Sequence, residues 1–390
     1  MNKQEYYAAA QNIIYLASCM VNDRVPDRTR IQEMNLEHVY QVAEKHLLAS
    51  IMAYALAAAG VKHDKFMMAQ AKAMRKNIIL DRDRTALLAF LEKEGIWYMP
   101  LKGAILKEYY PKSDMRQMSD NDILFDQTYR AQVKAYFESS GFVTDHYLKG
   151  LHDVYMKEPV SNFEMHVSLF THTIDEKIYN YYENVKERLI PDKPGGFGYH
   201  FTDEDFYIYI IAHEYKHYYK GGTGIRSLLD TYVYMQKFGD TLDDAYIQKE
   251  VEKLGISDFE KKNRSLALNL FGNGELTDEN KEMLEYIIDC GAYGSADNFI
   301  KNKVTRNGTS GKDKINYLKK RLFFPMPLVK EYYPFFYKHE ILLPFLLFYR
   351  LGRAMTVSRS KVSKEIKIMC QTESKTSTKS DPVSKNPNLP

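Results

Sequence analysis

The sequence predicts an α+β protein in which a small mixed β-sheet is flanked by helical regions on its N-terminal and C-terminal sides. Two observations support this fold class. Apolar residues recur every three or four positions over most of the chain, which is the period of an amphipathic helix. Between about Gly95 and Phe170 the period shortens to that of strands. We therefore expect a helical region over 1–94, a sheet region over 95–190 and a second helical region over 200–355.

The N-terminal region contains two long helical patterns. QVAEKHLLASIMAYALAAAG ends at Gly60, and AKAMRKNIILDRDRTALLAFLEKEG ends at Gly95. Glycine commonly follows the last turn of a helix. The apolar run 47–61 is shorter than the roughly 18 residues that a membrane span requires, so a buried helix is expected there.

Strands and helices alternate in the sheet region. GIWYMPLKG reads as a strand ending in a glycine turn, AILKEYY as a short helix and DNDILF as a second strand. TYRAQVKAYFESSG reads as a helix that ends at Gly141, and FVTDHYL, HDVYMKEPV and SNFEMHVSLF are further strands. The predicted order is β-α-β-α-β-β-β, a small sheet that carries two helices.

Helical patterns return after the predicted loop PDKPGGFG. Thr202 and Asp205 form a candidate capping box before FYIYIIAHEYKHYYK, which ends at Gly221. The segment IRSLLDTYVYMQKFG carries one apolar stripe, made of Ile225, Leu228, Leu229, Tyr232 and Val233. The tail 356–390 is rich in Ser, Thr, Lys and Pro and is expected to be disordered.

Composition restricts the classes of function. A net charge of +3 argues against a broad basic face for nucleic acid, although a local phosphate pocket is compatible with it. The cysteines Cys19, Cys290 and Cys370 are far apart, so we expect neither a disulfide framework nor a thiolate zinc site, and a reducing cytoplasm fits best. No apolar run is long enough for a membrane span, and the N-terminus lacks a signal-peptide pattern.

The pentapeptide HEYKH at 213–217 spells H-E-x-x-H, the zinc-peptidase motif. The further ligands of such enzymes are missing, because the metzincin positions hold Lys220 and Thr223. A hydrogen-bonded pair formed by His213 and His217, pointing inward, is therefore favoured over zinc catalysis. Three other residues share its helix face, namely Phe206, Tyr209 and Ile210.

A group of carboxylates in the sheet region is the stronger candidate site. Asp120 and Asp122 lie two apart in a strand, so both side chains point to one face about 6.6 Å apart, and Asn121 points away. Adjacent carboxylates require a cation, and oxygen donors select Mg²⁺ or Mn²⁺. Glu164 on a later strand is the best candidate for a third ligand. Such a set would hold two ions about 4 Å apart, as in phosphoryl or nucleotidyl transfer.

Several motifs, taken in order, carry a family resemblance. LKGAILKEYYPKSDMRQMSDNDILF, FEMHVSL and HEYKH…GIRSLLD resemble the bacterial uncharacterised nucleotidyltransferase family of the DNA polymerase beta superfamily, over most of residues 1–350. The shared pattern is a Lys-Gly turn, an Arg before a D-x-D strand, an E-x-H strand and a helical C-terminal half. The resemblance implies a nucleotidyltransferase palm at 95–190, with Asp120, Asp122 and Glu164 as metal ligands.

The phosphate-binding turn departs from the pattern of the wider superfamily, which has Gly-Ser or Gly-Gly where this chain has Lys102, Gly103 and Ala104. The missing hydroxyl removes one phosphate contact. Triphosphate binding would then depend on backbone amides at Gly103, where a helix begins, and on Lys102 or Arg116.

The predicted reaction is transfer of NMP from an NTP, such as ATP, to an unidentified acceptor, with release of pyrophosphate and with Mg²⁺ or Mn²⁺ as cofactor. Glu164 would serve as a metal ligand or as the general base. The alternative is a non-catalytic nucleotide-binding or sensor protein built on a degenerate transferase fold.

Five further residues are candidates for the pocket. His166 faces the same side as Glu164 and would orient the metal cluster or be a core histidine. Arg226 and Asp230 lie four apart on a helix, so they would pair with each other or leave Arg226 at the phosphates or acceptor. His213 and His217 would shape the nucleotide or acceptor pocket.

Overall fold

The computed structural model describes residues 1–148, 150–172, 175–294 and 333–356, together with residues 323, 326 and 329. The chain forms two compact units. The first comprises Met1–Tyr218 and Thr223–Tyr293, and the second comprises Tyr219–Gly222 and Gly294–Pro390. All candidate site residues belong to the first unit.

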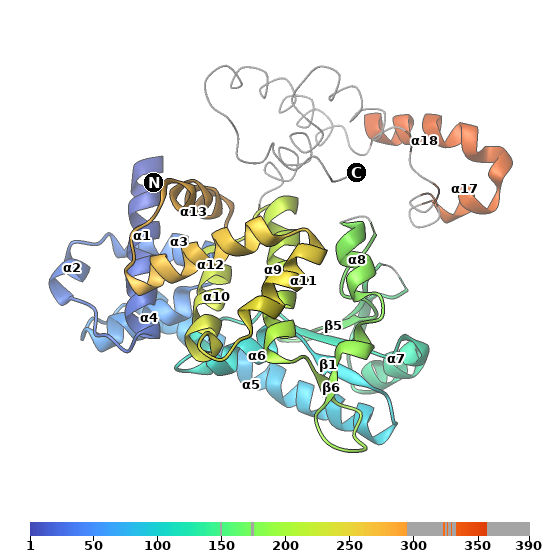
Figure 1. Ribbon diagram of the computed structural model, residues 1–390, viewed down its shortest axis with the longest axis horizontal. Coiled ribbons are helices and arrows are strands. Elements are labelled where there is room, and N and C mark those ends of the chain that lie inside the picture. The colour runs from blue at the N-terminus through green and yellow to red at the C-terminus, as the bar shows by residue number, and fades with distance from the viewer. Residues whose placement is uncertain are drawn as a thin grey trace. The chain divides into compact units, whose positions relative to one another are not determined.

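The N-terminal region of the first unit is helical, as predicted. Its helices are α1 Lys3–Val21, α2 Arg28–Gln32, α3 Leu36–Lys45, α4 Ala49–Ala58 and α5 Asp64–Lys93 (Figure 1). The first long pattern is divided into two helices, because Leu47 adopts a positive φ of 57° between α3 and α4. The break lets both helices pack against α1. Gly60 and Gly95 follow helix ends in the left-handed region.

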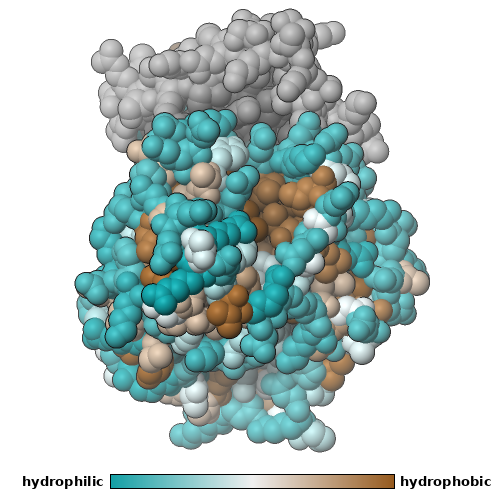
Figure 2. Space-filling model, turned by 90° about the vertical axis from the view of Figure 1, so that its left-hand side faces the viewer, coloured by the Kyte–Doolittle hydropathy of each residue, from teal (hydrophilic) through white to brown (hydrophobic). Residues whose placement is uncertain are grey.

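The apolar run 47–61 lies in the core, since most of α4 is buried. Within the described residues, no helix has the length and apolar character needed to cross a membrane. The face shown in Figure 2 is largely hydrophilic, with hydrophobic residues gathered in a few patches.

Five strands form one mixed sheet in the order β1-β2-β5-β4-β3. The strands are β1 Tyr98–Pro100, β2 Asn121–Phe125, β3 Val143–His146, β4 His152–Lys157 and β5 Ser161–His166. β2 and β5 are parallel, and the other neighbours are antiparallel. The helices are α6 Gly103–Leu106 and α7 Arg130–Ser139. The predicted order of elements and the α+β fold class are thus confirmed.

One face of the sheet packs against α5 and α7 and forms an apolar core. Phe137 of α7 stacks on Tyr155 of β4 with 4.1 Å between ring centroids. Other members of the core are Leu87, Leu91, Ile123, Val133, Phe163 and Met165. Because side chains alternate along a strand, Asp122 and Glu164 lie on the opposite face. Figure 1 shows α5 on one side of the sheet and α9 on the other.

A small hairpin interrupts the return to helix. α8 Glu176–Tyr182 precedes β6 Ile190–Pro191 and β7 Tyr199–His200, which pair antiparallel. The predicted loop PDKPGGFG is the connection between these strands and contributes Pro191 to the first. Strands of two residues have no period of their own, which explains why the sequence pattern did not reveal them. Four 3-10 helices occur among the described residues between Lys107 and Arg188, namely η1 Lys107–Tyr109, η2 Ser113–Met115, η3 Gln127–Tyr129 and η4 Val185–Arg188.

Helices dominate the rest of the first unit. They are α9 Asp203–Lys220, α10 Ile225–Phe238, α11 Asp244–Leu254, α12 Ser257–Gly272 and α13 Asp278–Cys290. Thr202 caps α9, since its Oγ1 accepts the Asp205 N–H at 3.1 Å. The Asp205 carboxylate accepts from Arg188 of η4 and Tyr246 of α11, so its side chain links α9 to these two elements. The predicted stripe of α10 is buried throughout.

The second unit contains α17 Pro334–Lys338, η5 Glu340–Leu342 and α18 Leu343–Thr356. Apart from Thr356, the tail predicted to be disordered lies outside the described residues, as does Cys370. Cys19 and Cys290 are buried thiols. The predicted division into regions 1–94, 95–190 and 200–355 stays a prediction.

Candidate functional site

The parallel pairing of β2 with β5 brings the predicted carboxylates together. Asp122 lies directly opposite Glu164, and Leu124 lies opposite His166. Asp120, immediately before β2, is close enough to Asp122 and Glu164 for their charges to raise its pKa. The strand register therefore gathers residues that are about 40 positions apart in the sequence.

Asn121 points to the other face, as its position between the two aspartates predicts. Its side-chain amide donates to the carbonyl of Leu80 at 2.9 Å, and Arg84 donates to its Oδ1 at 3.0 Å. Both partners belong to α5. Asn121 thus fixes β2 on the core helix and leaves the aspartates on the opposite side.

Asp122 is buried between two basic groups. Its Oδ1 accepts a hydrogen bond from His166 Nε2 at 2.8 Å, and its Oδ2 lies 3.3 Å from Lys102 Nζ. Burial alone would raise the pKa of Asp122, but Lys102 and His166 hold it well below its usual range. Asp122 is therefore ionised at physiological pH.

Asp120 differs from Asp122, because its surroundings raise its pKa rather than lower it. Burial, followed by the charges of Asp122 and Glu164, raises the pKa of Asp120 to about 7, although Lys102 and Arg226 act against the increase. Carboxylates that repel one another in this way are stabilised by a divalent cation. These three carboxylates are therefore suited to bind a cation that prefers oxygen ligands.

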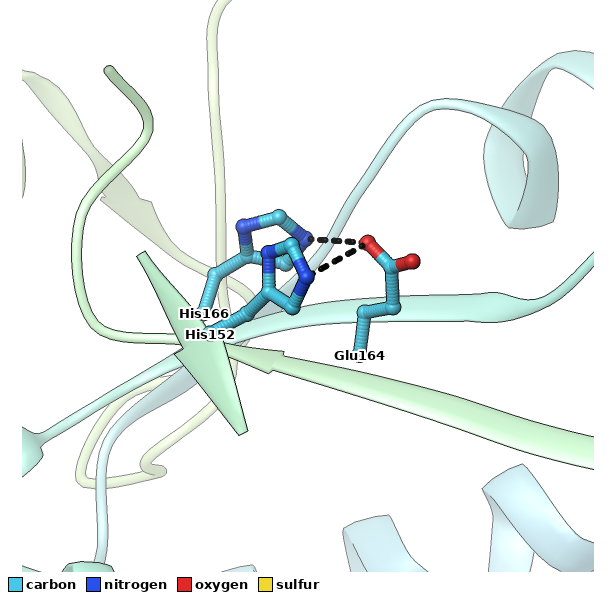
Figure 3. A group of neighbouring side chains, drawn as sticks. All are labelled: His152, Glu164 and His166. Carbon is cyan, nitrogen blue, oxygen red and sulfur yellow. Dashed lines mark ion pairs between the residues drawn. The ribbon is translucent and has the colours of Figure 1, made fainter. Parts of the chain in front are cut away.

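A second group of side chains converges on Glu164. Its Oε2 lies 3.6 Å from Nε2 of His152 and 3.6 Å from Nε2 of His166 (Figure 3). The three ligand atoms lie within 4.8 Å of one another and could hold a metal ion. In the part of the chain that the structure describes, no other group of three His, Cys, Asp or Glu residues has this spacing. Asp120, Asp122 and Glu164 therefore lie near one another but are less tightly grouped.

His152 was missed by the sequence analysis. It belongs to β4 and lies directly opposite His166 of β5 in the antiparallel register. The signal was present, since both histidines fall in predicted neighbouring strands. Recognising it required the register of the β4–β5 hairpin, which the two strand patterns do not specify.

The turn after β1 directs Lys102 toward Asp122. Lys102 has a φ of 40°, which is unusual for a residue with a side chain. A Cβ on Gly103 would lie 2.8 Å from Nη1 of Arg116 and 3.0 Å from the Met118 side chain. Gly103 thus makes room for the Arg116 guanidinium. Its predicted amide contact with phosphate stays a prediction, and the four-residue α6 has little dipole to support it.

Arg116 is held in a buried ion pair with Asp230. Its Nε and Nη2 each donate to one Asp230 oxygen at 2.8 Å. Tyr110 donates to the same carboxylate at 2.7 Å. Two of the Arg116 nitrogens that we expected to contact a triphosphate therefore already donate to Asp230.

Arg226 does not take Asp230 as its hydrogen-bond partner, which was one of the two sequence-based alternatives. Its Nη1 donates to the Gln117 carbonyl at 2.8 Å. Arg226 is half-buried and acts to lower the pKa of Asp120. Its position close to the carboxylates favours the other alternative, a role at the phosphates or the acceptor.

An open pocket of about 430 Å³ adjoins Asp120. Lys72 and Lys76 of α5 line it, one helical turn apart, together with the rings of Tyr40 and Tyr293. Burial lowers the pKa of Lys76, whereas the charge of Asp120 raises it. The pocket is large enough for a small molecule beside the carboxylates.

Comparison with known protein families gives one match. A family model described as an uncharacterised nucleotidyltransferase matches residues 32–272. The chain belongs to this family. The matched part contains all the predicted site residues, and the family-level resemblance is confirmed; membership of the DNA polymerase beta superfamily stays a prediction. No curated protein and no solved structure gives a significant match.

The HEYKH segment of this nucleotidyltransferase family member lies on α9. Nε2 of His213 and Nε2 of His217 are 3.0 Å apart. His213 is half-buried, but His217 is exposed, so the predicted inward orientation applies to His213 alone. Burial, followed by the charge of Lys102, holds the pKa of His213 well below its usual range. His213 thus lies near Lys102 and His166, which are the two basic partners of Asp122.

Glu214 points away from this pair. It is buried close to Asn263 of α12 and Thr231 of α10, both of which act to lower its pKa. A zinc peptidase needs this glutamate on the metal side of the helix. The two histidines and Glu214 therefore do not assemble into such a site.

Glu214 makes stability depend on pH. Neither of its carboxyl oxygens has a hydrogen-bond partner of ordinary geometry, and burial raises its pKa from the usual 4.5 to about 8. A folded-state pKa above the unfolded value contributes stability at low pH, and this contribution is lost as the pH rises from 4.5 to about 8. We expect Glu214→Gln to raise the thermal unfolding temperature by several degrees at pH 8, with little effect at pH 5. The free-energy gain would be at most about 4 kcal/mol.

Thermal unfolding of Glu214→Gln at both pH values checks this prediction. Glu282→Gln, on the exposed surface of α13, is the matched control and should leave both temperatures unchanged. An equal gain at the two pH values would contradict the titration of Glu214.

Proposed function

We propose that the protein is a metal-dependent nucleotidyltransferase that transfers NMP from an NTP to an acceptor and releases pyrophosphate. The observation that carries this proposal is the in-register pairing of β2 with β5, which sets Asp122 opposite Glu164 with Asp120 beside them. Membership of a family described as nucleotidyltransferases supports it.

Asp120, Asp122 and Glu164 would hold the divalent ions, either Mg²⁺ or Mn²⁺. Such ions, when bound, offset the charge of the triphosphate and lower the pKa of an acceptor hydroxyl. The donor set fits them, because burial and mutual repulsion raise the pKa of Asp120 and a cation would relieve that repulsion.

The residues of the chain would position the reactants for in-line attack. The acceptor oxygen forms a bond to the α-phosphorus as the bond from that phosphorus to the bridging oxygen breaks, and pyrophosphate leaves. Glu164, 27% exposed, would accept the proton of the acceptor hydroxyl if it is not itself a metal ligand.

We assign the triphosphate contacts to Lys102 and Arg226. Lys102 is 20% exposed and already contacts Asp122. Arg226 lies near Asp120, whereas the donors of Arg116 are used by Asp230. Preorganised cations of this kind stabilise charge that develops on the leaving group. The pocket beside Asp120 offers space for a small acceptor.

A nucleotide-binding sensor is the second candidate function. The observation that favours it is the phosphate-binding turn, in which the usual serine hydroxyl is missing and the space at Gly103 is occupied by Arg116. A protein of this kind would bind NTP without turnover.

Turnover with labelled substrates tests the proposal. The full chain is incubated with Mg²⁺ or Mn²⁺, each labelled NTP and fractions of a cell extract, and pyrophosphate release and labelled products are measured. We expect both signals with the native chain and neither with the double variant Asp120→Ala, Asp122→Ala. Asp126→Ala, at the other end of β2, is the control that should retain activity. Tight NTP binding without turnover in every fraction would support the sensor instead.

A further inference from the structure

We propose that His152, Glu164 and His166 bind a first-row divalent transition metal ion in preference to Mg²⁺. The property is independent of NTP and acceptor, so it goes beyond the proposed transfer reaction. The sequence predicts only carboxylate ligands at this site, and the proposal adds the imidazoles of His152 and His166.

The distances within this group fit a shared ion better than direct bonds between side chains. Both imidazole nitrogens lie 3.6 Å from Glu164 Oε2, which is too long for a hydrogen bond. Two ligands that each lie about 2.1 Å from one metal ion are about 3.0 to 3.5 Å apart. The three atoms thus surround a space that small movements would adapt to an ion.

The backbone holds the three ligands in a fixed arrangement. His152 and His166 are directly opposite each other in the antiparallel β4–β5 pair, with 4.8 Å between ring centroids. Glu164 projects from the same face of β5, two residues before His166. Figure 3 shows that both rings turn a nitrogen toward the same oxygen. Sites built on strands lose little entropy when a ligand binds.

The second ring nitrogens are also informative. Nδ1 of His152 and Nδ1 of His166 are buried, and neither has a hydrogen-bond partner. For His152, no bond therefore fixes the tautomer, whereas His166 Nε2 donates to Asp122 Oδ1, so a bound ion would take the place of that proton. With its proton on Nδ1, each imidazole would leave the Nε2 lone pair free for the ion.

The donor types determine the class of metal. Two imidazole nitrogens and one carboxylate suit Mn²⁺, Fe²⁺, Co²⁺ or Zn²⁺. Mg²⁺ prefers oxygen ligands in a near-octahedral arrangement and keeps several waters. Asp122 offers a fourth donor, because its Oδ1 is hydrogen-bonded to His166 Nε2 at 2.8 Å and would adjoin an ion that replaces the proton between them. The site would therefore discriminate against Mg²⁺ by ligand type.

Cobalt titration of the full chain tests this inference. Protein freed of metal by a chelator is titrated with Co²⁺ in a large molar excess of Mg²⁺, without nucleotide, and the visible absorption of bound Co²⁺ is recorded. We expect one Co²⁺ per chain. His152→Gln should raise the Kd for Co²⁺ at least about tenfold, since it removes one ligand. His146→Gln, on the exposed edge of neighbouring β3, is the matched control and should leave the Kd unchanged.

Three results would overturn the inference: displacement of Co²⁺ by Mg²⁺ at comparable concentrations, an unchanged Kd in a folded His152→Gln protein, or loss of Co²⁺ in His217→Gln alone. The last would place the ion at HEYKH. Circular dichroism and thermal unfolding establish that each variant is folded. Transfer supported by Mg²⁺ without a Co²⁺ preference would remove only this inference, and Co²⁺ binding without turnover would remove only the proposed function.

Discussion

Asp122→Asn is expected to reduce pyrophosphate release by about three orders of magnitude, which corresponds to about 4 kcal/mol of activation free energy. Asp122 is ionised, buried and within 3.3 Å of Lys102, and it faces Glu164 across the β2–β5 pair. Asparagine keeps the shape but removes the negative charge that a metal ion requires. Metal-assisted phosphoryl chemistry depends on that charge for several kcal/mol of transition-state stabilisation.

Steady-state kinetics with the NTP and acceptor fraction that support turnover would measure this effect. The loss should appear mainly in kcat, because ions held by the carboxylates would act on the reacting phosphate. Asp126→Asn changes another aspartate next to the same strand, at its far end, and should retain kcat. If Asp122→Asn kept more than about a tenth of the native kcat, Asp122 would have no part in the chemistry.

A structural cause for such a loss can be separated from a chemical one. Asp122 is the partner of His166 and Lys102, so the substitution also changes a buried hydrogen bond. The melting temperature and the NTP-binding affinity of Asp122→Asn should therefore be measured beside its kcat. A folded variant that binds nucleotide but transfers slowly would assign the defect to the reaction step.

The second large effect concerns stability. We expect Asp230→Ala to reduce the free energy of unfolding by about 3 to 5 kcal/mol, because it leaves the buried Arg116 guanidinium without its counter-charge. Arg116 is 7% exposed, and both of its bonds to Asp230 are 2.8 Å long. Tyr110 loses its acceptor as well. The cost comes from an unpaired buried charge rather than from the net value of the pair.

Denaturant unfolding, followed by circular dichroism, measures this change. The double variant Arg116→Met, Asp230→Leu should recover most of the loss, since it removes both charges together. Glu37→Ala breaks the exposed pair of Glu37 with Lys65, which has a 2.7 Å contact, and should change stability little. A loss in Asp230→Ala no larger than in Glu37→Ala would show that the buried pair is not required for folding.

Several features of the site could be predicted because local sequence patterns encode them. The two-residue period placed Asp120 and Asp122 on one side of β2 and Asn121 on the other, as the Asn121 contacts with α5 show. The β-α-β-α-β-β-β order followed from changes of period and from glycines at helix ends. Glu164 could be identified because it is the single acidic residue in its predicted strand, SNFEMHVSLF.

Other features depended on contacts between distant parts of the chain. Arg116 and Asp230 are 114 positions apart, and nothing near either residue specifies the other as its partner. His152 joined Glu164 and His166 only through the β4–β5 register. The division of the first helical pattern into α3 and α4 follows from packing on α1, which overrides helix propensity at Leu47.

The sequence by itself determined the α+β class, the alternation that exposes the aspartates on one side of β2, and the resemblance to a nucleotidyltransferase family. These depend on periods of two and 3.6 residues and on motif order, which a linear pattern contains. Only the tertiary structure decided which charges meet. It paired Arg116 with Asp230, left Arg226 near Asp120, and brought His152 to Glu164. The reason is that side-chain partners across strands and helices are set by register and packing, which the whole fold fixes at once.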